Sequence, residues 1–157
     1  MDICIVLGSK SDLPISDKCT SILEEFNIEH EVRVASAHRA PKYLEGVVSN
    51  AIEDGCNIFI GIAGMAAALP GVIASMTTLP VIGVPVGGKV PLDSLLSIVQ
   101  MPPGMPVATV GVDRGDNAAV LAVQMLSLTD QELAGRFALW RKEKTDKVIA
   151  DDESLRE

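Results

Sequence analysis

The sequence predicts an α/β fold built on a parallel sheet with helices on both faces. Short apolar runs alternate with segments of helical periodicity, which is the pattern of consecutive βαβ units. We read the runs as continuously apolar, as expected for strands that are covered on both sides. With 157 residues, of which 48% are hydrophobic, the chain suits one domain spanning residues 1–157. Because 3% of the residues are aromatic, the core must be aliphatic.

The N-terminal elements alternate in order. The apolar run 3–7 predicts the first strand, and the periodic pattern over 13–26 predicts the first helix. The run 31–34 predicts the second strand. Pro41 is favoured in the first turn of a helix, so the next helix is expected over 41–53.

The alternation continues through the middle of the chain. The run 58–62 predicts the third strand, the pattern over 66–76 a helix, and the run 81–84 the fourth strand. A helix at 92–99 and a fifth strand at 107–112 follow. These elements together predict a sheet of parallel strands joined by helical crossovers.

One stretch requires a test for membrane insertion. No charged residue occurs between Asp54 and Lys89, a length that could in principle span a bilayer. Prolines and glycines break this stretch into short pieces, so a buried strand, turn, helix and second strand explain it better. We therefore expect no membrane partner.

The C-terminal part predicts a helix at 117–128 and then an extra helix at 130–149. Thr129 or Asp130 can cap this last helix. Its apolar positions are sparse, and no strand follows it. We expect it to pack on a neighbouring subunit, although periodicity alone is equally compatible with packing on its own domain.

Charge and cysteine content exclude several classes. The formal net charge of -8 argues against a nucleic-acid partner, which would require a basic face. A small phosphorylated ligand is still allowed, because local backbone geometry can bind one phosphate on an acidic protein. Cys4, Cys19 and Cys56 are odd in number and widely spaced, so we expect reduced thiols in a cytoplasmic protein. The N-terminus lacks the basic region of a signal peptide.

The loop after the first strand is the first candidate for ligand binding. Ligands of open parallel sheets bind beyond the carboxyl ends of the strands, where the strand order reverses. Gly8-Ser9-Lys10-Ser11-Asp12 leads directly into a helix, whose free N–H groups can bind an anion. Gly8 permits a tight turn, and Asp12 either caps the helix or binds ribose hydroxyls. An ordinary capped helix start is the competing interpretation.

The loop after the second strand carries the clearest chemistry, in the segment Ser36-Ala37-His38-Arg39-Ala40-Pro41. His38 can gain or lose a proton near neutrality. Arg39 can bind a phosphate through two parallel hydrogen bonds. A lone loop histidine would be read as a surface residue, but the adjacent arginine at the binding edge favours a functional role. His30 lies where a strand begins, at the opposite edge, and is read as structural.

Two further loops belong to the same edge. The small residues of 63–71 let a ligand approach backbone N–H groups, although tight helix–sheet packing would use them equally. Residues 83–89 have the spacing of a phosphate-binding P-loop, but Val90 and Pro91 follow where that motif needs Ser or Thr. We expect instead a mobile loop that closes over a substrate, with Lys89 near its charge. No cluster of ligands predicts a metal site.

These segments resemble the PurE family, of the N5-carboxyaminoimidazole ribonucleotide mutase type. The resemblance covers nearly the whole chain. It rests on the motifs Gly8-Ser9-Lys10-Ser11-Asp12, Ser36-Ala37-His38-Arg39-Ala40-Pro41, the 63–71 loop, Asp93-Ser94-Leu95-Leu96-Ser97-Ile98-Val99-Gln100-Met101-Pro102 and Asn117-Ala118-Ala119. It implies a three-layer, flavodoxin-like (Rossmann-like) fold, a homo-octamer, and an active site that needs no ATP, metal or organic cofactor.

The resemblance also implies an activity and a set of site residues. The activity is a step of de novo purine biosynthesis, in which the carboxyl group on N5 of a phosphorylated aminoimidazole ribonucleotide is lost as CO2 and added at C4. His38 is the implied general acid/base, and Ser9, Asp12 and Arg39 bind the ribose phosphate. The implied substrate-binding set is Gly8, Ser9, Ser11, Asp12, Ser36, Ala37, Arg39, Gly64, Met65, Ala66 and Ala67.

Two departures from the family pattern leave an alternative open. Ala68 stands where many mutases of the family have a histidine, and the loop 87–92 is short. Direct carboxylation of aminoimidazole ribonucleotide with CO2 is therefore the second hypothesis, while the motifs at 8–12 and 36–41 favour the mutase. A non-catalytic nucleotide-sensing domain on the same fold is the alternative from another class.

Overall fold

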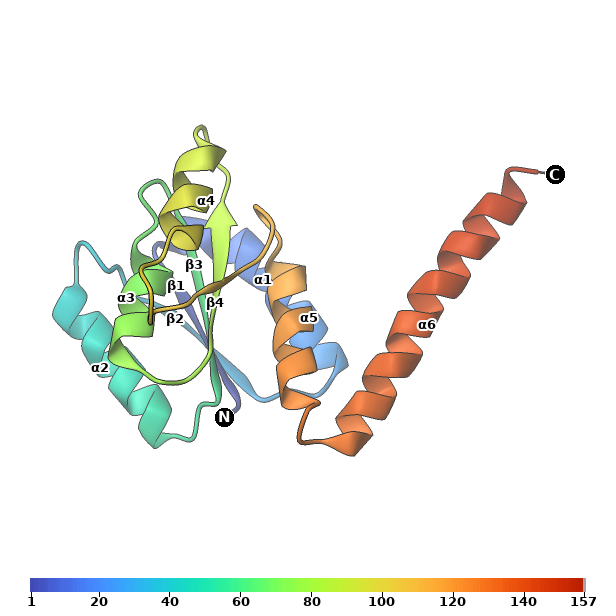
Figure 1. Cartoon of the computed structure of the whole chain (residues 1–157), viewed down its shortest axis with the longest axis horizontal. Helices are drawn as coiled ribbons and strands as arrows, with labels where there is room; N and C mark the ends of the chain where they lie inside the picture. Colours follow the sequence, from blue (N-terminus) through green and yellow to red (C-terminus); the bar gives the residue numbers. More distant parts are fainter. Residues whose placement is uncertain (157) are drawn as a thin grey trace. The chain divides into compact units, whose positions relative to one another are not determined.

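The computed structural model describes residues 1–156 and contains a five-stranded sheet in the order β2-β1-β3-β4-β5 (Figure 1). All neighbouring strands are parallel. This is the strand order of flavodoxin-like folds, so the predicted fold class is confirmed. The strands are β1 (Ile3–Leu7), β2 (His30–Val34), β3 (Ile58–Gly64), β4 (Val81–Val86) and β5 (Ala108–Thr109).

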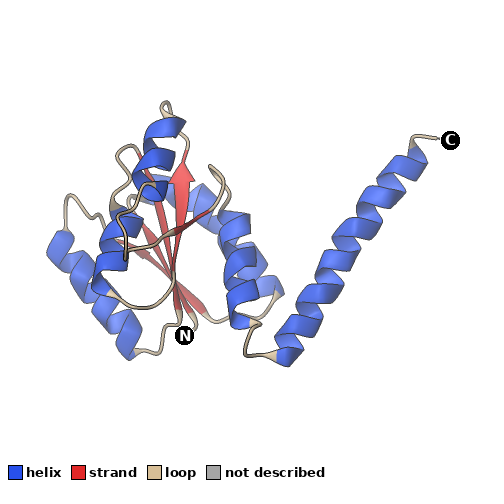
Figure 2. Cartoon of the chain, in the orientation of Figure 1, coloured by secondary structure: helices blue, strands red, loops and turns tan. Residues whose placement is uncertain are grey.

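Helices cover both faces of the sheet (Figure 2). Helices α2, α3 and α4 share one apolar cluster with the sheet, while α1 and α5 lie on the other side (Figure 1). The layers therefore number three, as expected for this fold class. The helical elements are η1 (Lys10–Asp12), α1 (Leu13–Glu25), α2 (Pro41–Glu53), α3 (Leu69–Met76), α4 (Pro91–Val99), α5 (Gly115–Leu126) and α6 (Gln131–Ser154).

The core is aliphatic, as the composition predicts. All five residues of β1 are fully buried, because helices cover both of its faces. Cys4 and Val6 contribute to the cluster beneath α2 and α3, which also contains Leu44 and Ile73. Each fully buried aliphatic side chain of this size contributes roughly 1.5–3 kcal/mol relative to exposure. The rigid sheet that results fixes where the loops at its edge begin.

The second strand corrects the expectation that every run is covered on both faces. β2 is an edge strand, and none of its residues is fully buried. Arg33 bonds Glu31 at 3.0 Å and the Tyr43 hydroxyl at 3.1 Å. Charged side chains on an edge strand discourage pairing with another chain, which explains why this run is not continuously apolar. His30, the first residue of the strand, bonds the Ile28 carbonyl through Nδ1 at 2.9 Å.

Several boundaries near the binding edge differ from the sequence expectation, and β4 ends at Val86 rather than at residue 84. β3 continues to Gly64, because Gly64 pairs with Val86 in the register of β3 and β4. The next helix consequently begins at Leu69 rather than at residue 66. The fifth strand covers two residues rather than 107–112, since its ladder with β4 involves Ala108 and Thr109 alone.

The chain forms two compact units, residues 1–122 and the part from residue 123 onward. The second unit contains α6, which extends to Ser154 instead of ending at 149. Asp130, not Thr129, caps it, because its Oδ1 accepts a hydrogen bond from the Leu133 N–H at 3.0 Å. Among residues 1–156, no helix combines the length and apolar composition that crossing a membrane requires.

Candidate active site

The candidate site lies at the carboxyl edge of the sheet, where the strand order reverses between β1 and β3. β1 continues toward β2 on one side, and β3 continues toward β4 on the other. The loops after these strands therefore diverge and leave space for a ligand between them. Gly8 lies at this reversal point between β1 and β3, because its N–H donates to the Ile62 carbonyl of β3 at 3.0 Å.

The loop after β1 is fixed by reciprocal capping bonds. The Ser9 N–H donates to Asp12 Oδ2 at 3.1 Å, and the Ser9 Oγ accepts from the Ser11 N–H at 3.4 Å. Asp12 thus belongs to a capping box around η1, and its side chain makes no capping bond to α1. The expectation that Asp12 caps the long helix is wrong for this reason.

Asp12 is a buried carboxyl group at this edge. The residue is 7% exposed, and the Ser11 hydroxyl donates to its Oδ1 at 3.3 Å. Burial raises the pKa of the Asp12 carboxyl above its ordinary value, while bonds from Ser11 and Ser9 and the charge of Arg39 offset part of that effect. A buried carboxyl group with spare acceptor capacity can receive hydroxyl donors from a ligand.

Arg39 joins the loop after β2 to the loop after β1. Its guanidinium Nη2 donates to the Gly8 carbonyl at 3.0 Å. Its backbone N–H and its Nε donate to the Ser36 Oγ at 3.2 and 3.3 Å. The structure therefore brings Gly8, Ser36 and Arg39 together, although Arg39 is 31 residues away from Gly8 in the sequence. The remaining guanidinium N–H groups can bind an anion.

His38 lies in the turn that Ser36 and Arg39 define. The turn spans residues 37–39, and the Ala40 N–H closes it on the Ser36 carbonyl at 2.9 Å. His38 is exposed, whereas Ala37 is half-buried. The structure therefore places the exposed imidazole next to Arg39 in one turn at the carboxyl edge of the sheet.

The loop after β3 presents backbone rather than polar side chains. Gly64 lies so close to β4 that an added Cβ would approach the Val86 Cβ to 3.3 Å. Met65 follows with a φ of 58°, in the left-handed region, and it is 84% exposed. Ala66 is exposed and Ala67 is buried against the core. A residue other than glycine held at positive φ next to a binding edge stores backbone strain.

The loop after β4 is held by Asp113, which the sequence did not predict as a site residue, and by Ser94. The Asp113 Oδ1 accepts from the Gly87 N–H at 2.9 Å. The hydroxyl of the fully buried Ser94 donates to the Val86 carbonyl at 2.8 Å. Asp113 directly follows the predicted fifth strand at 107–112, and this place at the end of a strand is the sequence signal that marks it.

The three cysteines are buried away from the candidate site's polar side chains. Cys4, Cys19 and Cys56 are free thiols in the structure, and their reduced state stays a prediction. Burial raises the pKa of Cys4 and of Cys19 to about 12, so neither thiol provides a nucleophile. Within residues 1–156, no group of His, Cys, Asp and Glu could hold a metal ion.

Comparisons with known proteins find relatives over nearly the whole chain. The family model described as AIR carboxylase matches residues 2–147. The N5-carboxyaminoimidazole ribonucleotide mutase of Methanocaldococcus jannaschii is 56% identical over 156 residues, covering 99% of this chain and 98% of that protein. The chloroplastic phosphoribosylaminoimidazole carboxylase of Vigna aconitifolia is 45% identical over 152 residues, covering 96% of this chain and 27% of that protein. Crystalline Treponema denticola PurE superposes with a TM-score of 0.90 and 30% identity over 99% of this chain and 98% of that one.

Proposed function

The chain belongs to the AIR carboxylase family, and on that premise we propose that it is an isomerase of de novo purine biosynthesis. It converts N5-carboxyaminoimidazole ribonucleotide to 4-carboxyaminoimidazole ribonucleotide. The observation that carries the proposal is the bond from Arg39 to the Gly8 carbonyl, which unites the loops after β1 and β2 at the switch point. The end-to-end match to a mutase gives that site its substrate.

The substrate's ribose phosphate binds to the loops after β1 and β2. Arg39 and the Ser9 hydroxyl bind the phosphate, because guanidinium and hydroxyl donors suit its oxygens. Ser11 lines the site beside Asp12, to which its own hydroxyl donates. Asp12 accepts bonds from ribose hydroxyls, which supply the donors that a buried carboxyl group needs. The half-buried Gly8, Ser36 and Ala37 shape the walls around the sugar.

The aminoimidazole ring extends toward the loop after β3. Backbone N–H groups of residues 64–67 bind its carboxylate, because the small side chains of Gly64, Ala66 and Ala67 allow close approach. Met65 lies beside the ring with its exposed side chain. The imidazole group of His38 then lies between the phosphate-binding loops and the reacting atoms.

His38 moves one proton in each half of the reaction. The bond between N5 and its carboxyl carbon breaks, CO2 leaves, and the imidazolium donates its proton to N5. The neighbouring enamine-like C4 then attacks the CO2, and the neutral imidazole removes the proton from C4. No proton or electron is gained or lost overall. Closure of the pocket against water keeps the CO2 and the labile carbamate in place.

Direct carboxylation is the second candidate function. It is favoured by Ala68, which occupies a half-buried position at the start of α3 and leaves His38 as the sole histidine in these loops. The name of the Vigna aconitifolia protein fits this reaction. In that case CO2 comes from solution, and His38 has only the C4 proton to remove.

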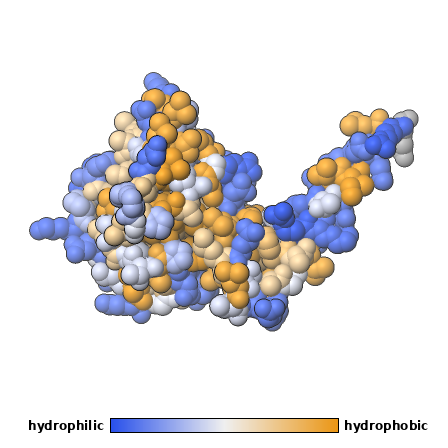
Figure 3. All heavy atoms as spheres, in the orientation of Figure 1, coloured by the Kyte–Doolittle hydropathy of each residue, from blue (hydrophilic) through white to orange (hydrophobic). Residues whose placement is uncertain are grey.

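We also propose a homo-octamer in the cytoplasm. Helix α6 carries exposed apolar side chains at Leu139, Val148 and Ile149, which burial on a neighbouring subunit would cover. Apolar side chains are likewise exposed along α4, at Leu92 and Leu96 (Figure 3). Three unpaired thiols fit a reducing compartment.

The test of function supplies the purified protein with two sets of reactants. We expect N5-carboxyaminoimidazole ribonucleotide alone to yield the C4-carboxylated product without added ATP. Conversion restricted to aminoimidazole ribonucleotide plus bicarbonate would replace the mutase assignment with the carboxylase. Turnover of neither reactant would contradict both candidate enzymes and favour a nucleotide-sensing domain.

A further inference from the structure

Asp113, located between β5 and α5, holds the loop after β4 from outside the predicted site. We infer that Asp113 is a positioning residue for the reaction, which acts by fixing the backbone of Gly87 beside the loop after β3. The inference rests on the proposed function, because its effect is measured on that reaction. Three contacts and one conformational constraint carry it.

The first contact is the bond from the Gly87 N–H to Asp113 Oδ1, at 2.9 Å. The two residues are 26 positions apart, so this bond joins two otherwise separate loops. Gly87 is buried, and an added Cβ would lie 2.8 Å from Asp113 Oδ2. The carboxylate therefore packs against the glycine as well as bonding it, and a larger residue at position 87 would have to displace the Asp113 carboxylate.

Asp113 is itself held in a conformation that serves this bond. Its φ is 58°, in the left-handed region that residues other than glycine adopt at a cost. Its N–H donates to the Pro85 carbonyl at 2.9 Å, and its own carbonyl accepts from the Lys18 Nζ at 3.3 Å. Three elements of the fold thus fix one aspartate, as is common where strain is retained for function.

The loop after β4 is fixed at both ends but not at its tip. Asp113 holds its first residue, Gly87, and the buried Ser94 holds the Val86 carbonyl and the Pro91 carbonyl at 2.8 and 3.0 Å. Between these anchors Gly88, Lys89 and Val90 are exposed. The position of the tip, and of the Lys89 ammonium, is therefore determined by where the anchors place the loop.

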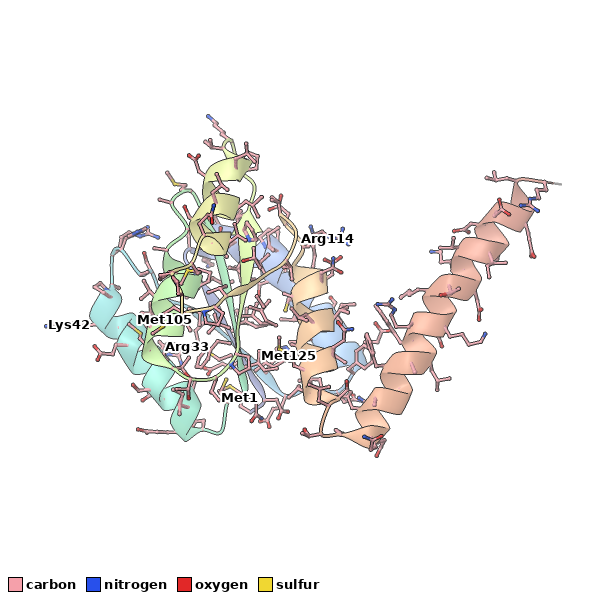
Figure 4. All side chains as sticks on the ribbon, viewed as in Figure 1. Met1, Arg33, Lys42, Met105, Arg114 and Met125 are labelled. Atoms are coloured by element: carbon pink, nitrogen blue, oxygen red, sulfur yellow. The ribbon has the colours of Figure 1, made fainter. Side chains whose placement is uncertain are left out.

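The anchored loop borders the candidate site. Gly87 follows Val86, and Val86 is paired with Gly64 in the register of β3 and β4. Gly64 is the first of the residues assigned to the ring and carboxylate of the substrate. Figure 4 labels Arg114, which follows Asp113 directly and lies at the N-terminal end of α5. The carboxyl end of β4 points toward the same end of that helix. A displacement of Gly87 would therefore displace Gly64 as well, because only the pairing of Val86 with Gly64 separates the two residues.

Two substitutions separate the hydrogen bond from the conformation. Asp113→Gly keeps positive φ accessible but removes the acceptor, whereas Asp113→Asn keeps both an acceptor oxygen and tolerance of positive φ. We expect Asp113→Gly to lower kcat/KM by about 10–100-fold, since misplacement near 1 Å can cost about that much. Asp113→Asn should stay within about threefold of wild type, because a neutral acceptor still bonds the amide.

Asp116→Asn is the matched control, three residues further along in the first turn of α5. Asp116 bonds Arg114 and the Asn117 N–H, both at 2.8 Å, and it contacts neither of the anchors of the β4 loop. Its substitution should change stability slightly and leave kcat/KM unchanged. Gly87→Ala tests the contact from the other side and should reproduce the loss seen in Asp113→Gly, with a smaller additional loss when both changes are combined.

Hydrogen exchange at the Gly87 N–H gives a readout that is independent of turnover. Exchange should be about tenfold faster in Asp113→Gly than in wild type and Asp113→Asn. The inference is overturned if Asp113→Gly retains wild-type kcat/KM, or if Asp113→Asn loses as much activity as Asp113→Gly, which would indicate a role for the charge itself. Wild-type protein inactive on both reactant sets would instead contradict the proposed function, with the exchange result still testing the anchor.

Discussion

Met65→Gly is expected to make the protein more stable and less active. Met65 has a φ of 58°, a conformation that costs a residue with a Cβ roughly 1–2 kcal/mol. Glycine removes that cost but loses about 0.5–1 kcal/mol more chain entropy on folding. Because the residue is 84% exposed, removing its side chain sacrifices little buried area. The net expectation is a gain of about 0.5–1 kcal/mol in the free energy of unfolding.

Urea unfolding at matched protein concentration measures this gain, since assembly would otherwise shift the midpoint. The melting temperature should rise by about 1–4 °C. Met65→Ala keeps the Cβ and should show no gain, and Asn27→Gly, at a φ of 52° away from the binding edge, should gain stability without loss of activity. The reasoning is refuted if Met65→Gly is no more stable than Met65→Ala, or if it gains stability with full kcat/KM.

Three further outcomes are expected. Asp12→Asn should be more stable than wild type at neutral pH. Because the pKa of the Asp12 carboxyl is raised in the folded protein, its contribution to stability is present below the ordinary value of 3.8 and is lost as the pH rises through the folded pKa. The difference in urea midpoint between the two proteins should therefore grow over that pH range and then stay constant. Arg39→Lys should raise KM about tenfold with little change in kcat, because the shorter ammonium lacks the planar fork that bonds Gly8 and still presents N–H groups to a phosphate. An unchanged KM would remove Arg39 from the binding site. Cys19 should resist a thiol reagent in the native protein and react after unfolding, and fast native labelling would contradict its burial.

Elements with sharp local signals are predictable from this sequence to the residue. Strand β1 matches its prediction at 3–7, because an apolar run ends abruptly at Gly8. Helix α2 matches at 41–53, because Pro41 sets its first turn. Strand β5 does not match, because a ladder with β4 that includes Ala108 and Thr109 alone depends on tertiary pairing that no local pattern encodes.

Part of the candidate site could likewise be predicted from the sequence, and part could not. The loops at 8–12 and 36–41 follow predictable strands, so their meeting at one edge could be expected from topology. The bond between Asp113 and Gly87 could not be predicted from the sequence, because it depends on a left-handed turn and joins residues 26 positions apart. The burial of Asp12 was also missed, since a capping box around a 3₁₀ turn looks in sequence like the cap of the longer helix.

In the proposed reaction, His38 carries the proton between C4 and N5. The direct test is His38→Asn, with kcat measured on N5-carboxyaminoimidazole ribonucleotide and ligand affinity measured by calorimetry. Because His38 is exposed in its turn, the substitution should leave the fold intact. We expect kcat to fall by about 10²–10⁴-fold, the usual contribution of a general acid/base, with the dissociation constant within about threefold of wild type. Turnover at the wild-type rate would contradict the account.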